Sequence, residues 1–168
     1  TLGSRKVVVR ADDKGNWQAR VGPYRAGGPH TITVAGESNT ITISNVMFGE
    51  VWVASGQSNM EWPVAASRNA EYEIKNSTNP AIRLFIVSKA SRPEPTRELT
   101  GSWSECSPET VRGFSAVAYF FGRALFRRLQ VPIGLIETAW GGTPAESWTA
   151  RSWLESDPDL TPMLTRIP

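Results

Sequence analysis

The chain has one cysteine and one histidine in 168 residues, and this scarcity excludes several kinds of site. Cys106 has no second cysteine with which to form a disulfide within the chain or a multi-cysteine zinc site. We therefore expect it to be a small, partly buried residue rather than a reactive thiol. No apolar run approaches the ~18 residues of a membrane-spanning helix. Both ends look like cuts through a longer protein, which we take as an expectation.

An excess of one charge is also missing. Lys and Arg number 18 against 16 Asp and Glu, which gives a net charge of +2. The basic residues form no continuous stripe, so nucleic acid is not indicated as a partner. An apolar fraction of 40% and a charged fraction of 20% are typical of a globular protein, and the length allows one or two domains.

Residues 1–47 read as all-β, and we expect part of a small β-sandwich accessory domain there. Strand patterns cover residues 5–12 and 16–21, with a turn of Asp, Lys and Gly between them. Two β-branched runs, 31–34 and 40–43, follow and predict a hairpin. His30 precedes the first run, and we interpret it as a loop or strand-start residue.

From residue 48 the pattern changes to that of an α/β layer. Apolar runs begin near Val51, Ile82 and Ile133, and we expect parallel strands, the first of them buried on both faces. A helix with one apolar face and Ser115 as its cap is predicted over 114–129. The residues of that face are Ala116, Tyr119, Phe120, Ala124, Leu125 and Arg128. The alternation of strands and helices predicts a parallel sheet over 48–168, whereas the Pro-containing segment 91–103 is expected to be a loop.

Two of the predicted strands end in chemically active residues. In parallel α/β sheets, ligands bind at the carboxyl ends of the strands. After the first strand, Ser58 follows a glycine and is flanked by Gln57 and Asn59, so a tight turn could present its hydroxyl to solvent. Taken alone, this pattern fits an ordinary polar turn better than a nucleophile.

The third strand ends in Gly141-Gly142-Thr143, with Glu146 shortly beyond. The two glycines leave backbone amides open to close approach by a substrate, and Thr143 could cap the segment that follows. Taken alone, this segment fits a flexible turn with a capping threonine better than a substrate site. Taken together, the two strand ends offer the parts of an acyl-transfer site, namely a nucleophile and oxyanion donors.

These residues carry a resemblance to a known family. The segments GEVWVASGQSNMEWPV (49–64) and GLIETAWGGTPAESW (134–148) resemble the two signature blocks of the sialate O-acetylesterases, which belong to the SGNH or GDSL-like hydrolases. Segments 13–34 and 113–125 resemble the preceding β-domain and the helix between the blocks. The resemblance spans almost the whole chain, but only the N-terminal portion of the family. It implies an incomplete flavodoxin-like, three-layer SGNH domain with a parallel sheet, preceded by part of the sandwich.

The resemblance also implies roles for single residues. Ser58 would attack the acetyl carbonyl of an O-acetylated sugar and become an acetyl-serine. The backbone N–H groups of Ser58 and Gly142, assisted by Gln57, would form the oxyanion hole. Supporting or substrate-binding roles would fall to Asn59, Gly141, Thr143 and Glu146, with Glu146 propping the nucleophile loop. The substrate would be acetylated sialic acid or a plant-wall polysaccharide such as xylan or xyloglucan, without metal or cofactor, in a secreted or periplasmic protein.

The chain departs from the family pattern because it has no suitable base. The family uses a histidine, oriented by an aspartate three residues earlier, near the C-terminal end of the hydrolase domain. His30 precedes the first block, and no histidine follows Asp157 or Asp159. A serine hydroxyl is a poor nucleophile without a base. We therefore expect the Asp and His on a missing piece or, preferably, on a second polypeptide that completes the hydrolase domain.

The composition offers two other functions. The seven Trp residues could make the chain a non-catalytic carbohydrate-binding fragment, although most Trp residues are core residues. A glycosidase would need two paired carboxylates. Candidates for such a pair are Glu50, Glu61, Glu137 and Glu146, but the sequence pairs none of them.

Overall fold

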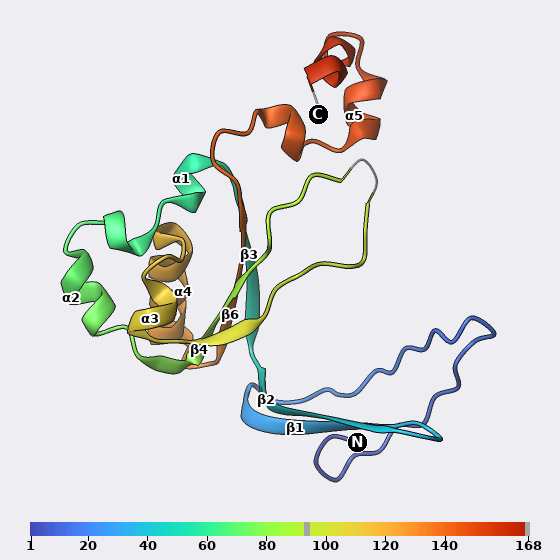
Figure 1. Cartoon of the computed structure of the whole chain (residues 1–168). Coiled ribbons are helices and arrows are strands. Elements are labelled where there is room, and N and C mark those ends of the chain that lie inside the picture. Colours follow the sequence, from blue (N-terminus) through green and yellow to red (C-terminus); the bar gives the residue numbers. More distant parts are fainter. Residues whose placement is uncertain (93–94, 167–168) are drawn as a thin grey trace. The chain divides into compact units, whose positions relative to one another are not determined.

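A computed structural model describes residues 1–92 and 95–166 of the chain. It divides into two compact units, Thr1–Glu50 and Val51–Pro168, which are described separately (Figure 1). No helix among the described residues is long and apolar enough to cross a membrane.

The first unit contains the hairpin that the β-branched runs predict. Strand β1 (Gly27–Ala35) pairs antiparallel with β2 (Thr40–Phe48), and Ala35 lies opposite Thr40 at the turn. His30 lies within β1 and packs its ring against Phe48, with ring centroids 5.2 Å apart. The hairpin prediction is confirmed, and His30 has a structural environment of aromatic contacts.

The two strands expected before this hairpin are wrong. Residues 6–12 and 16–21 form no strand, although the turn between them is present and is closed by the Asp12 carboxylate, which accepts from the Lys14 and Asn16 amides. Val8 and Trp17 are exposed by 81% and 53%. An alternating pattern describes a strand with one buried face, but pairing needs a partner strand, and none is present for these segments among the described residues. The only sheet described in this unit is two-stranded.

The second unit is built on a four-stranded sheet in the order β3-β6-β4-β5. The three predicted strands are β3 (Glu50–Gly56), β4 (Asn79–Ile86) and β6 (Ile133–Ala139). Strands β4 and β6 are parallel. The short edge strand β5 (Trp103–Cys106) was not predicted, and it pairs antiparallel with β4. The sheet is therefore mixed rather than purely parallel.

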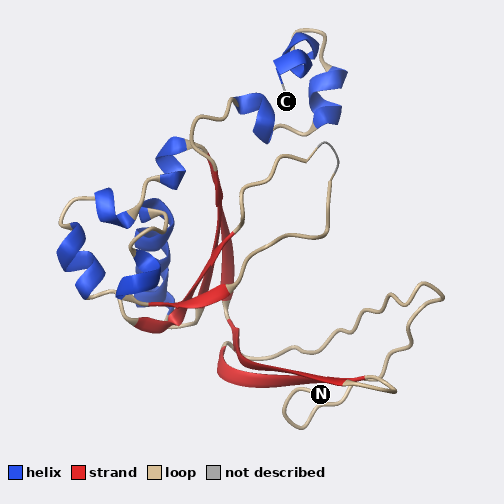
Figure 2. Cartoon of the chain, viewed as in Figure 1, coloured by secondary structure: helices blue, strands red, loops and turns tan. Residues whose placement is uncertain are grey.

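Helices α1 to α4 lie together on one side of this sheet (Figures 1 and 2). The longest is α4 (Ala116–Leu129). The remaining helical segments are α1 (Ser58–Glu61), η1 (Val64–Ala66), α2 (Ala70–Lys75), α3 (Pro108–Val111), η2 (Ala145–Trp148), α5 (Arg151–Ser156) and η3 (Thr161–Arg166).

Helix α4 forms where the apolar periodicity predicts it. The Ser115 hydroxyl accepts from the Ala118 amide at 3.1 Å and caps the helix, as expected. Tyr119 is 1% exposed, whereas Ala124 and Arg128, which were assigned to the buried face, are exposed. The predicted face thus holds in the first half of the helix and, in the second half, for Leu125, which packs against the core, but not for Ala124 and Arg128.

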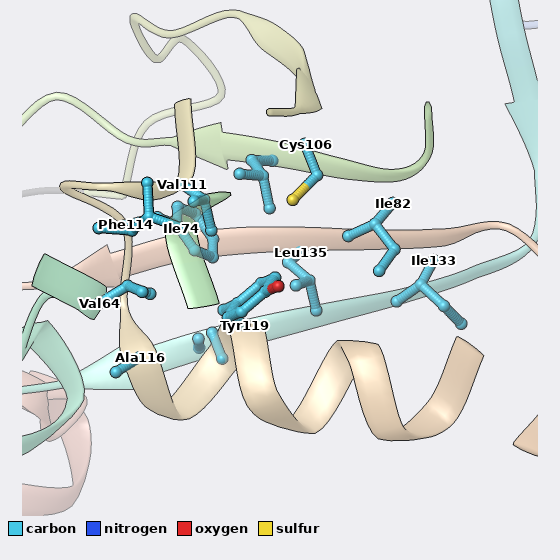
Figure 3. Close-up of a cluster of buried hydrophobic side chains, with 13 residues drawn as sticks. Val64, Ile74, Ile82, Cys106, Val111, Phe114, Ala116, Tyr119, Ile133 and Leu135 are labelled. Carbon is cyan, nitrogen blue, oxygen red and sulfur yellow. The ribbon is translucent and has the colours of Figure 1, made fainter. Parts of the chain in front are cut away.

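The hydrophobic core fills the space between α4 and the sheet (Figure 3). Its fully buried side chains come from strands and helices alike: Ile82, Leu84, Cys106, Phe114, Tyr119, Ile133 and Leu135. The Cys106 thiol donates to the Ser77 carbonyl, and burial raises its pKa to about 11. The thiol is therefore protonated at neutral pH, as expected for a structural cysteine.

Strand β3 does not have the two buried faces that its apolar run predicts. Val51, Trp52 and Val53 are exposed by 60%, 45% and 63%. Because β3 is an edge strand, one side of it has no neighbour. Trp52 still contacts Phe121 of α4, but Val51 and Val53 alternate to the opposite sheet face. That face carries no helix in the described part of this unit (Figure 2).

A buried carboxylate links β6 to the start of α4. Glu137 is 6% exposed, and its Oε2 accepts a hydrogen bond from the Ser115 amide at 2.8 Å. Burial raises the pKa of this carboxyl, and the nearby Glu61 charge raises it further. The Ser115 hydrogen bond and the Lys89 charge act in the opposite direction.

Replacement of Gly122 by Ala tests the close packing of α4 on β6. A Cβ at this position would lie 2.6 Å from Leu135 Cδ1 and 3.1 Å from its Cγ. Alanine favours a helix by ~1 kcal/mol, but overpacking costs about 1–3 kcal/mol, so we expect a net loss of roughly 1 kcal/mol of unfolding free energy. Gly113→Ala, whose Cβ would meet nothing within 4 Å, is the control for denaturant unfolding. Equal stability of both variants would contradict the packing described.

The raised pKa of Glu137 predicts a pH-dependent component of stability. Between its unfolded and folded pKa values, the folded chain binds the proton that the unfolded chain has released, so the free energy of unfolding falls as pH rises. Glu137→Gln removes this component and can still accept from Ser115. We expect the variant to gain stability relative to the wild type as pH rises above the ordinary pKa of glutamic acid through the raised pKa of Glu137. A difference that does not change with pH would refute this, and the exposed Glu98→Gln is the control.

Candidate functional site

The two blocks meet because β3 and β6 are neighbours in the sheet. Just beyond the strands, the Trp140 amide donates to the Gly56 carbonyl at 2.9 Å. This bond extends the strand pairing by one step into the loops. The residues that follow Gly56 and Trp140 are therefore held side by side at one edge of the sheet.

A sharp turn presents Ser58 at the end of β3. Gly56 has a φ of +139°, a backbone conformation that favours glycine. The amides of Met60 and Glu61 then both donate to the Gln57 carbonyl, which starts the short helix α1. As a result, Ser58 begins α1 and its side chain is exposed.

The Ser58 hydroxyl contacts residues of both blocks. Its Oγ donates to Gln57 Oε1 at 2.8 Å and accepts from the Gly142 amide at 3.3 Å. The Ser58 amide also donates to Gln57 Oε1, at 3.0 Å. The structure thus brings Ser58, Gln57 and Gly142 together. The amide oxygen of Gln57 holds the hydroxyl hydrogen but cannot take the proton as a base would.

The loop after β6 needs glycines because its backbone lies very close to the nucleophile turn. A Cβ on Gly141 would lie 2.6 Å from Glu61 Oε2 and 3.2 Å from Ser58 Oγ, so a larger residue does not fit. Gly142 has a φ of +80°, which any other residue rarely adopts. The loop after β6 therefore packs its bare backbone against the nucleophile turn.

Sequence reasoning missed the contacts of Glu61 and Lys89. Glu61 Oε2 accepts from the Gly141 amide, and Glu61 Oε1 forms an ion pair with Lys89. The Lys89 hydrogen bond, with support from the Gly141 amide, lowers the pKa of Glu61. Glu61 lies one helical turn after Ser58 inside the first block, which is a usable signal, whereas nothing in the sequence points to Lys89.

The other predicted residues have varied surroundings. Thr143 does not cap a helix, because the residue at the cap position of η2 is Pro144, which makes no side-chain cap hydrogen bond. The Thr143 hydroxyl donates to the Trp140 carbonyl at 2.7 Å and accepts from Trp148 Nε1 at 2.7 Å. Glu146 is 8% exposed within η2. Asn59 is exposed on α1. The supporting role expected of Glu146 stays a prediction, and the Glu61 carboxylate accepts from the Gly141 amide.

The second unit provides no histidine for Ser58. His30 belongs to the first unit, where it contacts Phe48. Asp157 and Asp159 lie close in sequence beyond α5, and the Asp157 carboxylate accepts from the Asp159 amide at 2.9 Å. No group of His, Cys, Asp and Glu among the described residues is arranged to hold a metal ion.

Comparison with known proteins gives consistent matches. Residues 48–166 match the family described as carbohydrate esterase, sialic acid-specific acetylesterase. The sialate O-acetylesterase of Rattus norvegicus is 34% identical over 165 residues, which cover 90% of this chain and 30% of that protein. The Homo sapiens sialate O-acetylesterase is 33% identical, over 87% of this chain and 30% of that protein.

A solved structure gives the same result in three dimensions. The crystal structure of a carbohydrate acetylesterase from Xanthomonas citri has a TM-score of 0.89 and 32% sequence identity, over 95% of this chain and 37% of that one. The chain thus spans about a third of the length of the proteins that it matches. With a family match across most of its length, the chain belongs to the sialic acid-specific acetylesterase family of carbohydrate esterases.

Proposed function

We propose that this chain supplies the nucleophile and an oxyanion donor of a serine esterase that removes O-acetyl groups from sugars. The observation that carries the proposal is the 3.3 Å contact between Ser58 Oγ and the Gly142 amide, made by two loops 84 residues apart. Acyl transfer needs a nucleophilic hydroxyl and, beside it, a backbone N–H that can donate to the oxyanion. Family membership supports the acetyl ester as the bond cleaved.

The proposed reaction has two steps. Ser58 Oγ attacks the acetyl carbonyl while its proton passes to a base. The oxyanion of the tetrahedral intermediate accepts a hydrogen bond from the Gly142 N–H. The sugar hydroxyl leaves with a proton from the same base, and an acetyl-serine remains. Water then releases acetate by the reverse proton path. For the Ser58 amide to serve as a second donor, its bond to Gln57 Oε1 must open.

The base is proposed to lie on a further segment or on a second polypeptide that carries an Asp and a His. The sequence holds one histidine, and it lies in the first unit. The sheet face that carries Val51, Val53 and Trp103 supports an additional piece, because these side chains are exposed by 60%, 63% and 49%. Apolar area of this kind is normally covered. A helix layer there would complete a three-layer SGNH domain, and further strands in the first unit would complete a sandwich.

The substrate class follows from the relatives and is part of the proposal. The curated relatives are sialate O-acetylesterases, and the structural relative is a carbohydrate acetylesterase. An acetylated sialic acid fits both descriptions, and an acetylated plant-wall polysaccharide such as xylan or xyloglucan fits the second. Such substrates lie outside the cytoplasm, so we propose a secreted or periplasmic location. The chemistry proposed here requires no metal or cofactor.

Ser58→Ala tests the nucleophile. In the esterase assembled with the piece that carries the base, we expect acetate release from acetylated sugars to fall roughly 1,000-fold or more while the fold persists. A serine-reactive phosphonate should label Ser58 of the wild type, and peptide mass analysis would locate it. Ser67→Ala, a turn residue whose hydroxyl bonds to the Val64 carbonyl, is the control. Undiminished turnover or labelling elsewhere would refute Ser58 as the nucleophile, whereas a wild type with neither turnover nor labelling would favour the non-catalytic carbohydrate-binding alternative.

The missing base predicts that residues 1–168 alone hydrolyse acetyl esters negligibly. Without general-base help the Ser58 hydroxyl is a weak nucleophile. Intact-mass analysis of the native protein should find more polypeptide than the 18.5 kDa of this chain. Full esterase activity from the purified 168-residue chain would show that the base lies within it.

A further inference from the structure

We propose that Glu61 is a positioning residue that holds the Gly141–Gly142 loop in place so that the Gly142 amide faces the nucleophile, with Lys89 as its counter-charge. The role deepens the proposed esterase function and rests on it. The carboxylates that the sequence suggested for support do not include Glu61. The contacts of this side chain assign it the role.

One carboxylate ties together the ends of three strands. Glu61 lies on α1, directly after β3. Its Oε2 accepts from the Gly141 amide in the loop after β6, and its Oε1 pairs with Lys89, which follows β4. These strands are neighbours in the sheet, so the Glu61 contacts fix their loops at the edge where Ser58 lies.

The hydrogen bond to Gly141 fixes the peptide next to that of Gly142. Each peptide is a rigid plane, so with the Gly141 N–H anchored only the φ and ψ angles of Gly141 remain to orient the Gly142 amide. With this anchor in place, the Gly142 amide lies 3.3 Å from Ser58 Oγ. The close fit at Gly141, where a Cβ would lie 2.6 Å from Glu61 Oε2, leaves the loop little room to shift. A preorganised donor is what an oxyanion needs, because it requires no reorganisation during the reaction.

Lys89 neutralises the negative charge that the Glu61 carboxylate would otherwise place beside an oxyanion. An unpaired negative charge near the site would oppose the negative charge that develops on the substrate. Lys89 pairs with Glu61 and its Nζ lies 5.7 Å from the centre of the Trp140 ring. The ion pair keeps Glu61 ionised as a strong acceptor while its net charge is cancelled.

The first test follows the Gly141 amide by NMR in the isotope-labelled 168-residue chain. The groups that act on Glu61 are Lys89, the Gly141 amide and the buried Glu137. We expect the Gly141 amide shift to titrate with a pKa below the ordinary range of glutamic acid, and this pKa should rise in Lys89→Gln. Glu61→Gln should abolish the titration. A Gly141 shift that is insensitive to pH or to Glu61→Gln overturns the proposal, whether or not the protein is an esterase.

The second test measures kinetics in the assembled esterase. Glu61→Ala should lower kcat roughly 10- to 100-fold with little change in KM, since the donor is lost in the transition state rather than in substrate binding. Glu61→Gln keeps an acceptor for Gly141 and should recover most of that loss. Glu71→Ala, which removes an exposed carboxylate paired with Arg112, is the control. A kcat unchanged by Glu61→Ala overturns the role. An inactive wild type would instead refute the proposed function and leave the NMR result standing.

Discussion

The pairing of β3 with β6 is the constraint on which the site depends. The bond from the Trp140 amide to the Gly56 carbonyl carries this pairing into the loops. Without it, the nucleophile turn and the glycine pair would be two unrelated loops. With it, the bare backbone of the Gly141–Gly142 loop reaches Ser58. The core between α4 and the sheet fixes the strands, and the strands fix the site.

Two neighbouring carboxyl groups near this edge of the sheet differ in charge. Glu137 is buried and bonded to the start of α4, and burial favours its neutral form. Glu61 is partly exposed, and Lys89 favours its ionised form. Environment, rather than residue type, gives the two carboxyls opposite tendencies.

Some features of the fold could be predicted because local patterns decide them. The hairpin of β1 and β2, the apolar run of β4 and the Ser115 cap of α4 each depend on neighbouring residues in the sequence. The strand predicted over residues 16–21 is absent because an alternating pattern alone does not supply a partner strand. Strand β5 was missed because four residues carry too little pattern, and it forms by pairing with β4. The exposed edge position of β3 likewise depends on strand order, which periodicity does not encode.

The sequence by itself determined the chemistry available: a serine after one strand, a glycine pair after another, and a single histidine outside both blocks. The family resemblance followed from those two blocks. Only the tertiary structure decided that Ser58 Oγ and the Gly142 amide lie 3.3 Å apart, and that the Glu61 carboxylate contacts the glycine loop. The reason is physical: residue type fixes what a group can do, whereas contacts between residues some 80 positions apart arise only when the strands pair and the core packs.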